Sequence, residues 1–191
     1  MTGLILTNAS AIDRSKTDFY PTPNEVTQAL LNFLNIEEGA TIWEPACGDG
    51  KMAKVLLSNG KYNIVASDLY DMGYGTAGID FLSATKPKGL DWIITNPPFA
   101  ISEDFIRKCF DHNCNFAMLL KSQYWHSKKR FDLFEMRKPK YVLPLTWRPD
   151  FLSGAKGGAP TMEVLWTVWG TDNAQTTQYV PLLKPKSINS I

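Results

Sequence analysis

Residues 40–51 read Ala40-Thr41-Ile42-Trp43-Glu44-Pro45-Ala46-Cys47-Gly48-Asp49-Gly50-Lys51, and apolar residues at helical spacing follow up to Leu57. The pattern predicts a short strand that ends at Glu44, a tight glycine loop, and a helix that starts near Asp49. Gly48 and Gly50 would let a ligand approach the backbone closely, and the helix N-terminus favours a carboxylate. The loop lacks the Gly-Lys-Ser/Thr of a P-loop and the three glycines of a dinucleotide site, so triphosphates and NAD are disfavoured ligands.

Two acidic residues follow the next predicted strand ends. The run Tyr62-Asn63-Ile64-Val65-Ala66-Ser67 leads into Asp68, about twenty residues past the glycine loop, where doubly wound folds place an acid that binds a ribose. Further on, Asp80 could accept a hydrogen bond from the amino group of an adenine, and Phe81 could lie on a purine face. Each acid by itself is more typical of a solvated turn, but their positions after successive strands predict a nucleoside site.

A third motif, Asn96-Pro97-Pro98-Phe99, follows the apolar strand pattern Trp92-Ile93-Ile94-Thr95. Two prolines in a row have fixed φ and no N–H, so the chain leaves the strand in a rigid turn whose carbonyls face outward. Asn96 adds an amide oxygen and Phe99 a flat apolar ring, an arrangement that suits a planar NH2 group. Hydrogen bonds accepted from such a group push electron density toward its nitrogen as it attacks an electrophile. Alone, the tetrapeptide is equally typical of a plain strand-to-loop turn.

In this order, the three motifs resemble those of the S-adenosylmethionine-dependent amino-methyltransferases, specifically the adenine-N6 DNA methyltransferases in which the cofactor motif precedes the catalytic one. The resemblance covers roughly residues 16–170. It implies an α/β fold with a Rossmann-like class I methyltransferase sheet, mostly parallel with an antiparallel C-terminal hairpin strand. It also implies S-adenosylmethionine as cofactor, S-adenosylhomocysteine as product, and no metal. Protein-glutamine and guanine-N2 relatives use similar tetrapeptides, so the tetrapeptide alone does not fix the substrate.

The resemblance implies roles for individual residues. Asn96, Pro97, Pro98 and Phe99 correspond to the catalytic motif. The stretch Asp18-Phe19-Tyr20-Pro21-Thr22-Pro23 corresponds to an upstream element over the methionine end of the cofactor. The residues implied to bind the cofactor are Tyr20, Thr22, Glu44, Ala46, Cys47, Gly48, Gly50, Asp68, Leu69, Asp80 and Phe81.

The composition indicates one domain, because 191 residues with 44% hydrophobic content can bury a substantial core. We expect a single methyltransferase domain at 17–170, an N-terminal arm at 1–16 and a C-terminal tail at 171–191. No apolar run reaches membrane-spanning length and the N-terminus lacks the order of a signal peptide, so we expect a cytoplasmic protein of a bacterium or phage-infected cell. The three cysteines show no CxxC spacing, which disfavours a zinc site or a disulfide framework.

Positive charge gathers in the second half of the chain. Residues 121–160 hold nine Lys and Arg against three Asp and Glu, whereas the rest of the chain holds 11 and 16. A basic run is often only a solvated helix face, but this one follows the catalytic motif and includes aromatic residues, which favours a nucleic-acid partner. The candidate contacts are Lys121, Tyr124, Trp125, Lys128, Lys129, Arg130, Arg148, Phe151 and Lys156. Because little chain remains for a recognition domain, we expect 121–130 and 148–160 to read the target.

The remaining pattern alternates helices and strands. Thr22-Pro23-Asn24-Glu25 predicts an N-cap and a capping box for a helix through about Leu34. Ser102-Glu103-Asp104 predicts the start of another helix. A strand at 115–120, a helical stretch at 127–136 and two final strands at 141–145 and 163–169 complete the expected layout.

The expected reaction is transfer of a methyl group from S-adenosylmethionine to N6 of adenine in DNA, after the base has flipped out of the duplex and stacked on Phe99. Phe151 is a second candidate to face the base, with packing on the sheet as the equal alternative. Three other functions stay open: adenine methylation in RNA, protein-glutamine methylation, and a non-catalytic nucleic-acid-binding module. The basic, aromatic stretch argues against a protein substrate. The sequence leaves monomer and dimer undecided.

Overall fold

The structure is a computed structural model, and it describes residues 20–151 and 162–186. The predicted nucleic-acid contact Lys156 and the predicted arm 1–16 lie outside the described residues. The elements are α2 (Asn24–Phe33), β1 (Thr41–Glu44), α3 (Lys51–Ser58), β2 (Asn63–Ala66), β3 (Leu90–Thr95), η1 (Phe99–Ile101), α4 (Ser102–His112), β4 (Asn115–Lys121), η2 (Ser122–Trp125), η3 (Lys128–Arg130), α5 (Phe131–Met136), β5 (Tyr141–Pro144), β6 (Val164–Trp169) and β7 (Gln178–Tyr179). None of the helices in this described part is long and apolar enough to cross a membrane.

Seven strands form one sheet in the order β2-β1-β3-β4-β6-β5-β7. β1 pairs in parallel with β2 and β3, and β3 pairs in parallel with β4. β6 is antiparallel to both β4 and β5, which confirms the closing hairpin and the mostly parallel α/β sheet expected from the sequence. After β1 the chain adds β2 on one side and β3 on the other. In open sheets of this kind, ligands bind outside the carboxyl ends of the strands where the order reverses.

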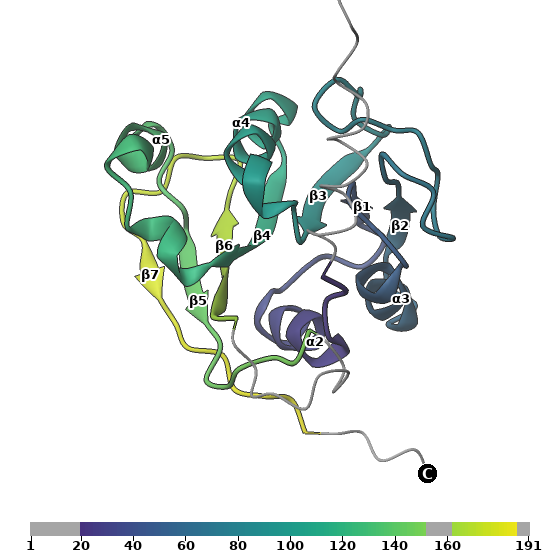
Figure 1. The fold of residues 1–191 in the computed structure, drawn as a ribbon, viewed down its shortest axis with the longest axis horizontal. Coiled ribbons are helices and arrows are strands. Elements are labelled where there is room, and N and C mark those ends of the chain that lie inside the picture. The colour runs from purple at the N-terminus through teal and green to yellow at the C-terminus, as the bar shows by residue number, and fades with distance from the viewer. Residues whose placement is uncertain (1–19, 152–161, 187–191) are drawn as a thin grey trace, which may run out of the picture.

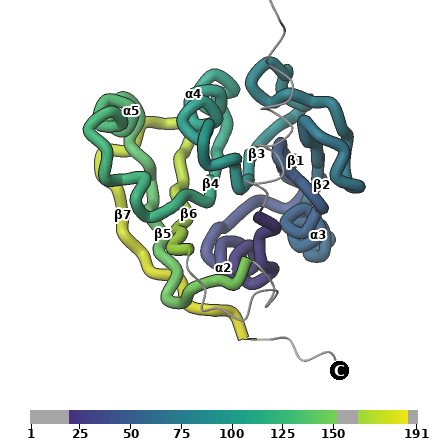
Figure 2. The backbone as a smooth tube through the Cα atoms, viewed as in Figure 1, coloured from purple at the N-terminus to yellow at the C-terminus, as the bar shows by residue number. Residues whose placement is uncertain are grey.

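Helices cover both faces of the sheet. Alternation along β4 directs Ala117 and Leu119 toward the core that α2 and α3 complete, and Phe116 and Met118 toward the core that α4 and α5 complete. Figure 1 shows α2 and α3 on one side of the sheet and α4 and α5 on the other. The tube in Figure 2 follows the same path and ends with β7 running along β5 at the outer edge.

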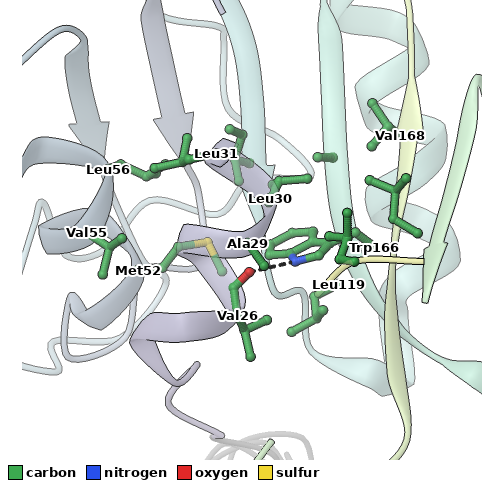
Figure 3. Packing of buried hydrophobic residues seen from close by; sticks show 14 of the residues in the cluster. Val26, Ala29, Leu30, Leu31, Met52, Val55, Leu56, Leu119, Trp166 and Val168 are labelled. Carbon is green, nitrogen blue, oxygen red and sulfur yellow. Dashed lines mark hydrogen bonds between the residues drawn. The ribbon is translucent and has the colours of Figure 1, made fainter. Parts of the chain in front are cut away.

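One buried tryptophan ties α2 to the sheet. Trp166 of β6 is fully buried, and its indole Nε1 donates a hydrogen bond of 3.1 Å to the carbonyl of Val26 in the first turn of α2 (Figure 3). Leu119 packs in the same cluster, and Met52 and Leu56 extend it toward α3. The start of α2 is therefore held against the sheet, and so is the segment that enters the helix.

Part of the expected C-terminal tail belongs to the sheet. β7 pairs in parallel with β5, and the backbone N–H of Leu182 then donates to the carbonyl of Pro144 at 2.8 Å. Leu182 is 5% exposed and belongs to the core cluster. The expectation of a tail from residue 171 onward therefore fails for 178–182. A two-residue strand has no periodicity to detect, and its pairing depends on an edge formed far earlier in the chain.

The N-cap and capping box predicted at Thr22 to Glu25 are not formed, although the helix exists, and α4 begins at Ser102 as predicted. The N-cap position of α2 is Pro23 and that of α4 is Ile101, and neither makes a side-chain capping hydrogen bond. The hydroxyl groups of Thr22 and Ser102, which would be the capping groups, bond elsewhere. The predicted helical stretch 127–136 is divided into η3 and α5.

Candidate active site

The predicted catalytic motif lies at the carboxyl end of β3. Thr95, the last residue of β3, is level with Met118 of the parallel neighbour β4. β3 ends at Thr95, and β4 continues to Lys121. By the alternation that directs Ile94 into the core under α2, Asn96 faces the same side of the sheet.

The side chain of Asn96 is fixed by the segment that precedes α2. Its Nδ2 donates one hydrogen bond to the backbone carbonyl of Tyr20 and one to Oγ1 of Thr22, both at 3.1 Å. The carbonyl of Tyr20 can only accept, so the amide nitrogen must point toward it. Asn96 Oδ1 is buried and has no hydrogen-bond partner among the described residues. A buried acceptor without a partner is costly, which makes this oxygen a ready acceptor for a ligand N–H.

The turn after Asn96 is braced by its own carbonyls. The carbonyl of Pro98 accepts from the N–H of Ile101 at 3.1 Å and from Oγ of Ser102 at 3.3 Å. The carbonyl of Phe99 accepts from the same hydroxyl at 2.8 Å. Within the described parts of the chain, no N–H or O–H group donates a hydrogen bond to the carbonyl of Pro97. The expected pair of acceptors, Asn96 Oδ1 and the Pro97 carbonyl, therefore remains unused within the described protein.

Aromatic rings surround this corner of the sheet. The ring of Tyr20 lies 5.9 Å from that of Phe99 and 6.4 Å from that of Phe151, centroid to centroid. The Nζ of Lys121 lies 4.2 Å from the centroid of Phe99. Phe151 is buried, whereas Tyr20, Phe99 and Lys121 are partly exposed. The structure therefore brings the predicted Phe99, Phe151 and Lys121 together, and adds the ring of Tyr20, whose expected place was over the cofactor.

The predicted cofactor acid Glu44 ends β1 and is 2% exposed. Its Oε2 is buried without a hydrogen-bond partner among the described residues. Burial raises the pKa of Glu44 well above its ordinary value. A hydrogen bond from the backbone N–H of Ala53 lowers this pKa, whereas the negative charges of nearby Asp68 and Asp49 raise it further. A cationic ligand group placed at Oε2 would reverse this penalty, because an opposite charge favours the ionised carboxylate.

Asp68 holds the glycine loop in place. Its Oδ2 accepts from the N–H of Gly48 and its Oδ1 from the N–H of Tyr70, both at 2.9 Å. The predicted ribose acid therefore joins the end of β2 to the glycine loop at the end of β1. Leu69, next in the chain, is 49% exposed, and Ala46 is half-buried. These residues line the strand ends where a nucleoside was expected.

The sequence reasoning missed a segment that folds back over the glycine loop. In this segment Thr76 donates from its N–H to the carbonyl of Ala66 at 2.9 Å, and the carbonyl of Tyr74 lies 3.4 Å from Cys47 Sγ. A Cβ on Gly50, whose φ is 78°, would lie 2.3 Å from the ring of Tyr74. A side chain at position 50 would therefore clash with this ring and would also have to adopt a positive φ, and both constraints favour glycine there.

The thiol of Cys47 is neutral in this setting. Burial, followed by the charges of Glu44 and Asp68, raises its pKa to about 12. Gly75, in the segment that folds back, has a φ of 70°, and a Cβ there would lie 2.8 Å from Cys47 Sγ. The signal that could have revealed the contact is Gly73-Tyr74-Gly75, a short run rich in glycine between the two predicted nucleoside acids.

The predicted purine platform is wrong for Phe81. Its ring is 2% exposed and lies 4.6 Å from that of Phe105 and 5.2 Å from that of Trp43, so it belongs to the core under α4. The preceding Asp80 is exposed, and its Oδ1 accepts from the N–H of Leu82 at 3.0 Å. This is the turn role weighed as the alternative for the acid, and it leaves Oδ2 for a ligand.

The basic segment after β4 is partly structural. Tyr124 is 7% exposed in the core, and the Arg130 guanidinium lies 3.8 Å over its ring and donates to its carbonyl at 2.9 Å. Trp125 stacks on Phe134 with centroids 4.2 Å apart. Tyr124 is therefore corrected from a nucleic-acid contact to a core residue, and the half-buried Arg130 packs on its ring, although the Tyr124 hydroxyl and Arg130 Nε have no hydrogen-bond partner among the described residues.

The remaining basic candidates differ in whether their charged group is already paired with a carboxylate. Lys128 and Lys129 are exposed on η3. Arg148 is also exposed, but its guanidinium is paired with Glu163 at 2.9 Å. Among the residues that the structure describes, no group of three or more His, Cys, Asp or Glu is arranged to hold a metal ion.

No model of a known protein family matches the chain, and no curated protein matches it either. Solved structures share its fold. A type I restriction-modification system methyltransferase subunit from Streptococcus thermophilus superposes with a TM-score of 0.62 at 15% identity, over 86% of this chain and 47% of that one. A Listeria monocytogenes protein provisionally assigned as a class I S-adenosylmethionine-dependent methyltransferase gives 0.58 at 14% identity, over 84% and 65%. A 23S rRNA methyltransferase gives 0.55 at 9% identity, over 81% and 71%.

These similarities show the fold. The sheet and its helices are those of the Rossmann-like class I methyltransferases, as the sequence predicted. The chain spans about half the length of the restriction-modification subunit and just under two thirds of the Listeria protein.

Proposed function

We propose that this protein transfers a methyl group from S-adenosylmethionine to the N6 amino group of adenine in DNA. The observation that carries the proposal is the state of Asn96, whose Nδ2 is held by Tyr20 and Thr22 while its Oδ1 is buried without a partner among the described residues. An amide fixed in this orientation is suited to accept from an NH2 group. The aromatic ring of Phe99, two residues beyond Pro97, supplies a face for the ring that carries that group.

The residues at the ends of β1 and β2 fit S-adenosylmethionine. Glu44 offers a buried carboxyl oxygen without a partner, which suits the ammonium group of the methionine end. Asp68 is held by two backbone N–H groups and lies where doubly wound folds bind a ribose. Ala46, Cys47, Gly48 and Gly50 would form the wall between them, with Leu69 and Asp80 toward the adenine end. When bound, the cofactor supplies an activated methyl group and takes up the electron pair of the broken carbon–sulfur bond.

The chain itself contributes positioning and electrostatic stabilisation. Asn96 Oδ1 and the Pro97 carbonyl accept from the two N–H bonds of the target amino group and turn its lone pair toward the methyl carbon. The amino nitrogen becomes positively charged as the new bond forms, so two preorganised oxygen dipoles favour this state over the neutral amine. The surplus proton leaves the nitrogen for solvent after the transfer. Phe99 holds the flipped base by stacking, worth roughly 1–3 kcal/mol.

A nucleic-acid substrate is supported by exposed Lys128 and Lys129 after β4 and by neighbours that include a type I restriction-modification system methyltransferase subunit and a 23S rRNA methyltransferase. A protein-glutamine substrate would use the same two acceptors but would leave the aromatic corner and the basic segment without a role. Adenine in RNA would use both, so it is an outcome of the test below.

The test is methyl transfer from labelled cofactor to genomic DNA, total RNA and protein in parallel, followed by mapping of the modified atom. We expect N6-methyladenine in DNA. Asn96→Ala should lower the rate roughly a hundredfold or more, the scale of losing one preorganised polar contact, with unchanged cofactor affinity. Asn96→Asp keeps an acceptor oxygen and should retain more activity than Asn96→Ala. An Asn96→Ala protein that is folded, binds cofactor and is fully active would contradict the proposal, and label appearing only in RNA or protein would reassign the substrate.

A further inference from the structure

Lys121 places an ammonium group in the candidate active site. It ends β4 on the face that carries Ala117 and Leu119, so its side chain lies on the same side of the sheet as Tyr20 and Phe151. Its Nζ lies 4.2 Å from the centroid of Phe99, the ring on which a target base would stack. No salt bridge to Lys121 occurs within residues 20–151 and 162–186, where Glu163, the acidic residue before its sheet partner Val164, is paired with Arg148.

This arrangement conflicts with the reaction if it persists. The target amino nitrogen gains positive charge as it is methylated, and an ammonium group beside the same ring would raise the energy of that state. A half-exposed contact between an ammonium and a phenyl ring is weak, whereas a lysine paired with a phosphate is a charge-assisted interaction. A flipped nucleotide brings both a base for Phe99 and a phosphate on each side of its sugar.

We propose that Lys121 keeps the face of Phe99 covered in the free protein and passes to a phosphate flanking the target nucleotide when the base enters. Lys121 is thus a positioning residue that couples capture of the base to capture of its backbone. This inference rests on the proposed function, because it assumes that Phe99 receives the base. It assigns the partner of Lys121 by chemistry as a nucleotide phosphate rather than a base edge or a protein carboxylate.

The test uses three probes: 2′-deoxyadenosine and its 3′- and 5′-monophosphates, titrated by ligand-observed NMR. Saturating S-adenosylhomocysteine is present throughout so that the probes cannot enter the cofactor pocket. The parent should bind one of the monophosphates about tenfold or more tightly than the nucleoside, the scale of one charge-assisted contact. Lys121→Met keeps an apolar chain of similar length but should bind nucleoside and monophosphates equally. Lys121→Arg should restore the preference.

A matched control is Lys140→Met, because the Nζ of Lys140 also lies over an aromatic ring, 5.8 Å from the centroid of Tyr141 on β5. It should behave as the parent. With polynucleotide, Lys121→Met should raise KM and leave kcat unchanged, and its binding should lose about one unit of salt dependence.

Four results would overturn the inference. An undiminished monophosphate preference in Lys121→Met would mean that another group holds the phosphate. A loss of nucleoside affinity with the preference intact would mean that Lys121 contacts the base. A parent protein that methylates nucleic acid but shows no preference for a monophosphate would contradict this inference and leave the proposed function intact. A parent protein that neither methylates nucleic acid nor binds the nucleoside would contradict both the inference and the proposed function.

Discussion

Thr22 offers a test of how the side-chain amide of Asn96 is held. Its Oγ1 accepts one of the two hydrogen bonds from Asn96 Nδ2 at 3.1 Å, and the residue is 4% exposed. In Thr22→Val the side chain keeps its shape but loses this acceptor, and burial leaves little access for water to replace it. The Tyr20 carbonyl still holds the other amide hydrogen, so the amide should keep its orientation but lose part of its rigidity.

The expected loss can be stated as a rate. One hydrogen bond contributes about 0.5–1.5 kcal/mol, and a donor left unpaired in a buried site costs about 1–3 kcal/mol. If the substitution raises the activation free energy of methyl transfer by about 1–2 kcal/mol, the transfer rate should fall roughly fivefold to thirtyfold. That is a smaller loss than expected for Asn96→Ala, because the acceptor oxygen remains.

The assay is single-turnover methyl transfer from labelled cofactor to fragmented genomic DNA, with cofactor affinity measured by calorimetry on the same preparations. Thr22→Ser is the matched control, because it returns the hydroxyl without the methyl group and should recover most of the rate. A parent-like rate in Thr22→Val would refute the reasoning. So would a fall in cofactor affinity at an unchanged transfer rate, which would return Thr22 to the cofactor contact that the sequence suggested.

Three further changes test the rest of the site. Asp68→Ala should weaken cofactor binding by removing ribose hydrogen bonds worth roughly 1.5–3 kcal/mol each, and should also lower the melting temperature because Gly48 loses its acceptor; calorimetry showing unchanged affinity would exclude Asp68 from the site. Lys128→Ala with Lys129→Ala should flatten the salt dependence of DNA binding and spare cofactor affinity, and equal salt slopes would mean that these lysines only solvate η3. Glu44→Gln should stabilise the free protein increasingly as the pH rises above the unfolded pKa of about 4.3. The folded pKa of Glu44 lies above the unfolded one, so the parent loses stability as the pH rises from the unfolded pKa toward the folded pKa, and glutamine does not. An equal difference between the melting temperatures at pH 5 and pH 8 in both proteins would contradict this.

The parts of the fold that follow from local sequence were predictable. The glycine loop, the acid at position 68 and the Asn96 motif each follow an apolar strand, and parallel strands bring their carboxyl ends to one edge. The two closing strands followed from two apolar runs, and their antiparallel pairing was implied by the family resemblance. These signals depend on neighbours within a few residues, so no knowledge of tertiary contacts was needed.

Contacts between distant segments were not predictable in the same way. The partners of Asn96 lie 76 and 74 residues earlier in the chain. Phe81 follows an acid that the sequence pattern placed after a strand, which favoured a purine platform. The described residues form no strand between β2 and β3, and Trp43 and Phe105 converge on Phe81 from other elements and bury it. In each case the environment of a side chain is determined by residues far away in the sequence, and a local sequence pattern cannot show that these residues lie beside it.

The uncapped starts of α2 and α4 indicate how the site is built. A capping Ser or Thr contributes about 1 kcal/mol to a helix, so a chain with Thr22 before α2 and Ser102 at the start of α4 would be expected to use both. Instead, Thr22 accepts from the Asn96 amide, and Ser102 donates to the carbonyls of Pro98 and Phe99. Both helices that flank the Asn96 turn thus begin without a side-chain cap, and both hydroxyls brace the turn. Local rules tend to fail where a sequence serves a site, and the absence of a side-chain cap from both helices around one tetrapeptide therefore supports a preorganised turn over a plain connection between β3 and α4.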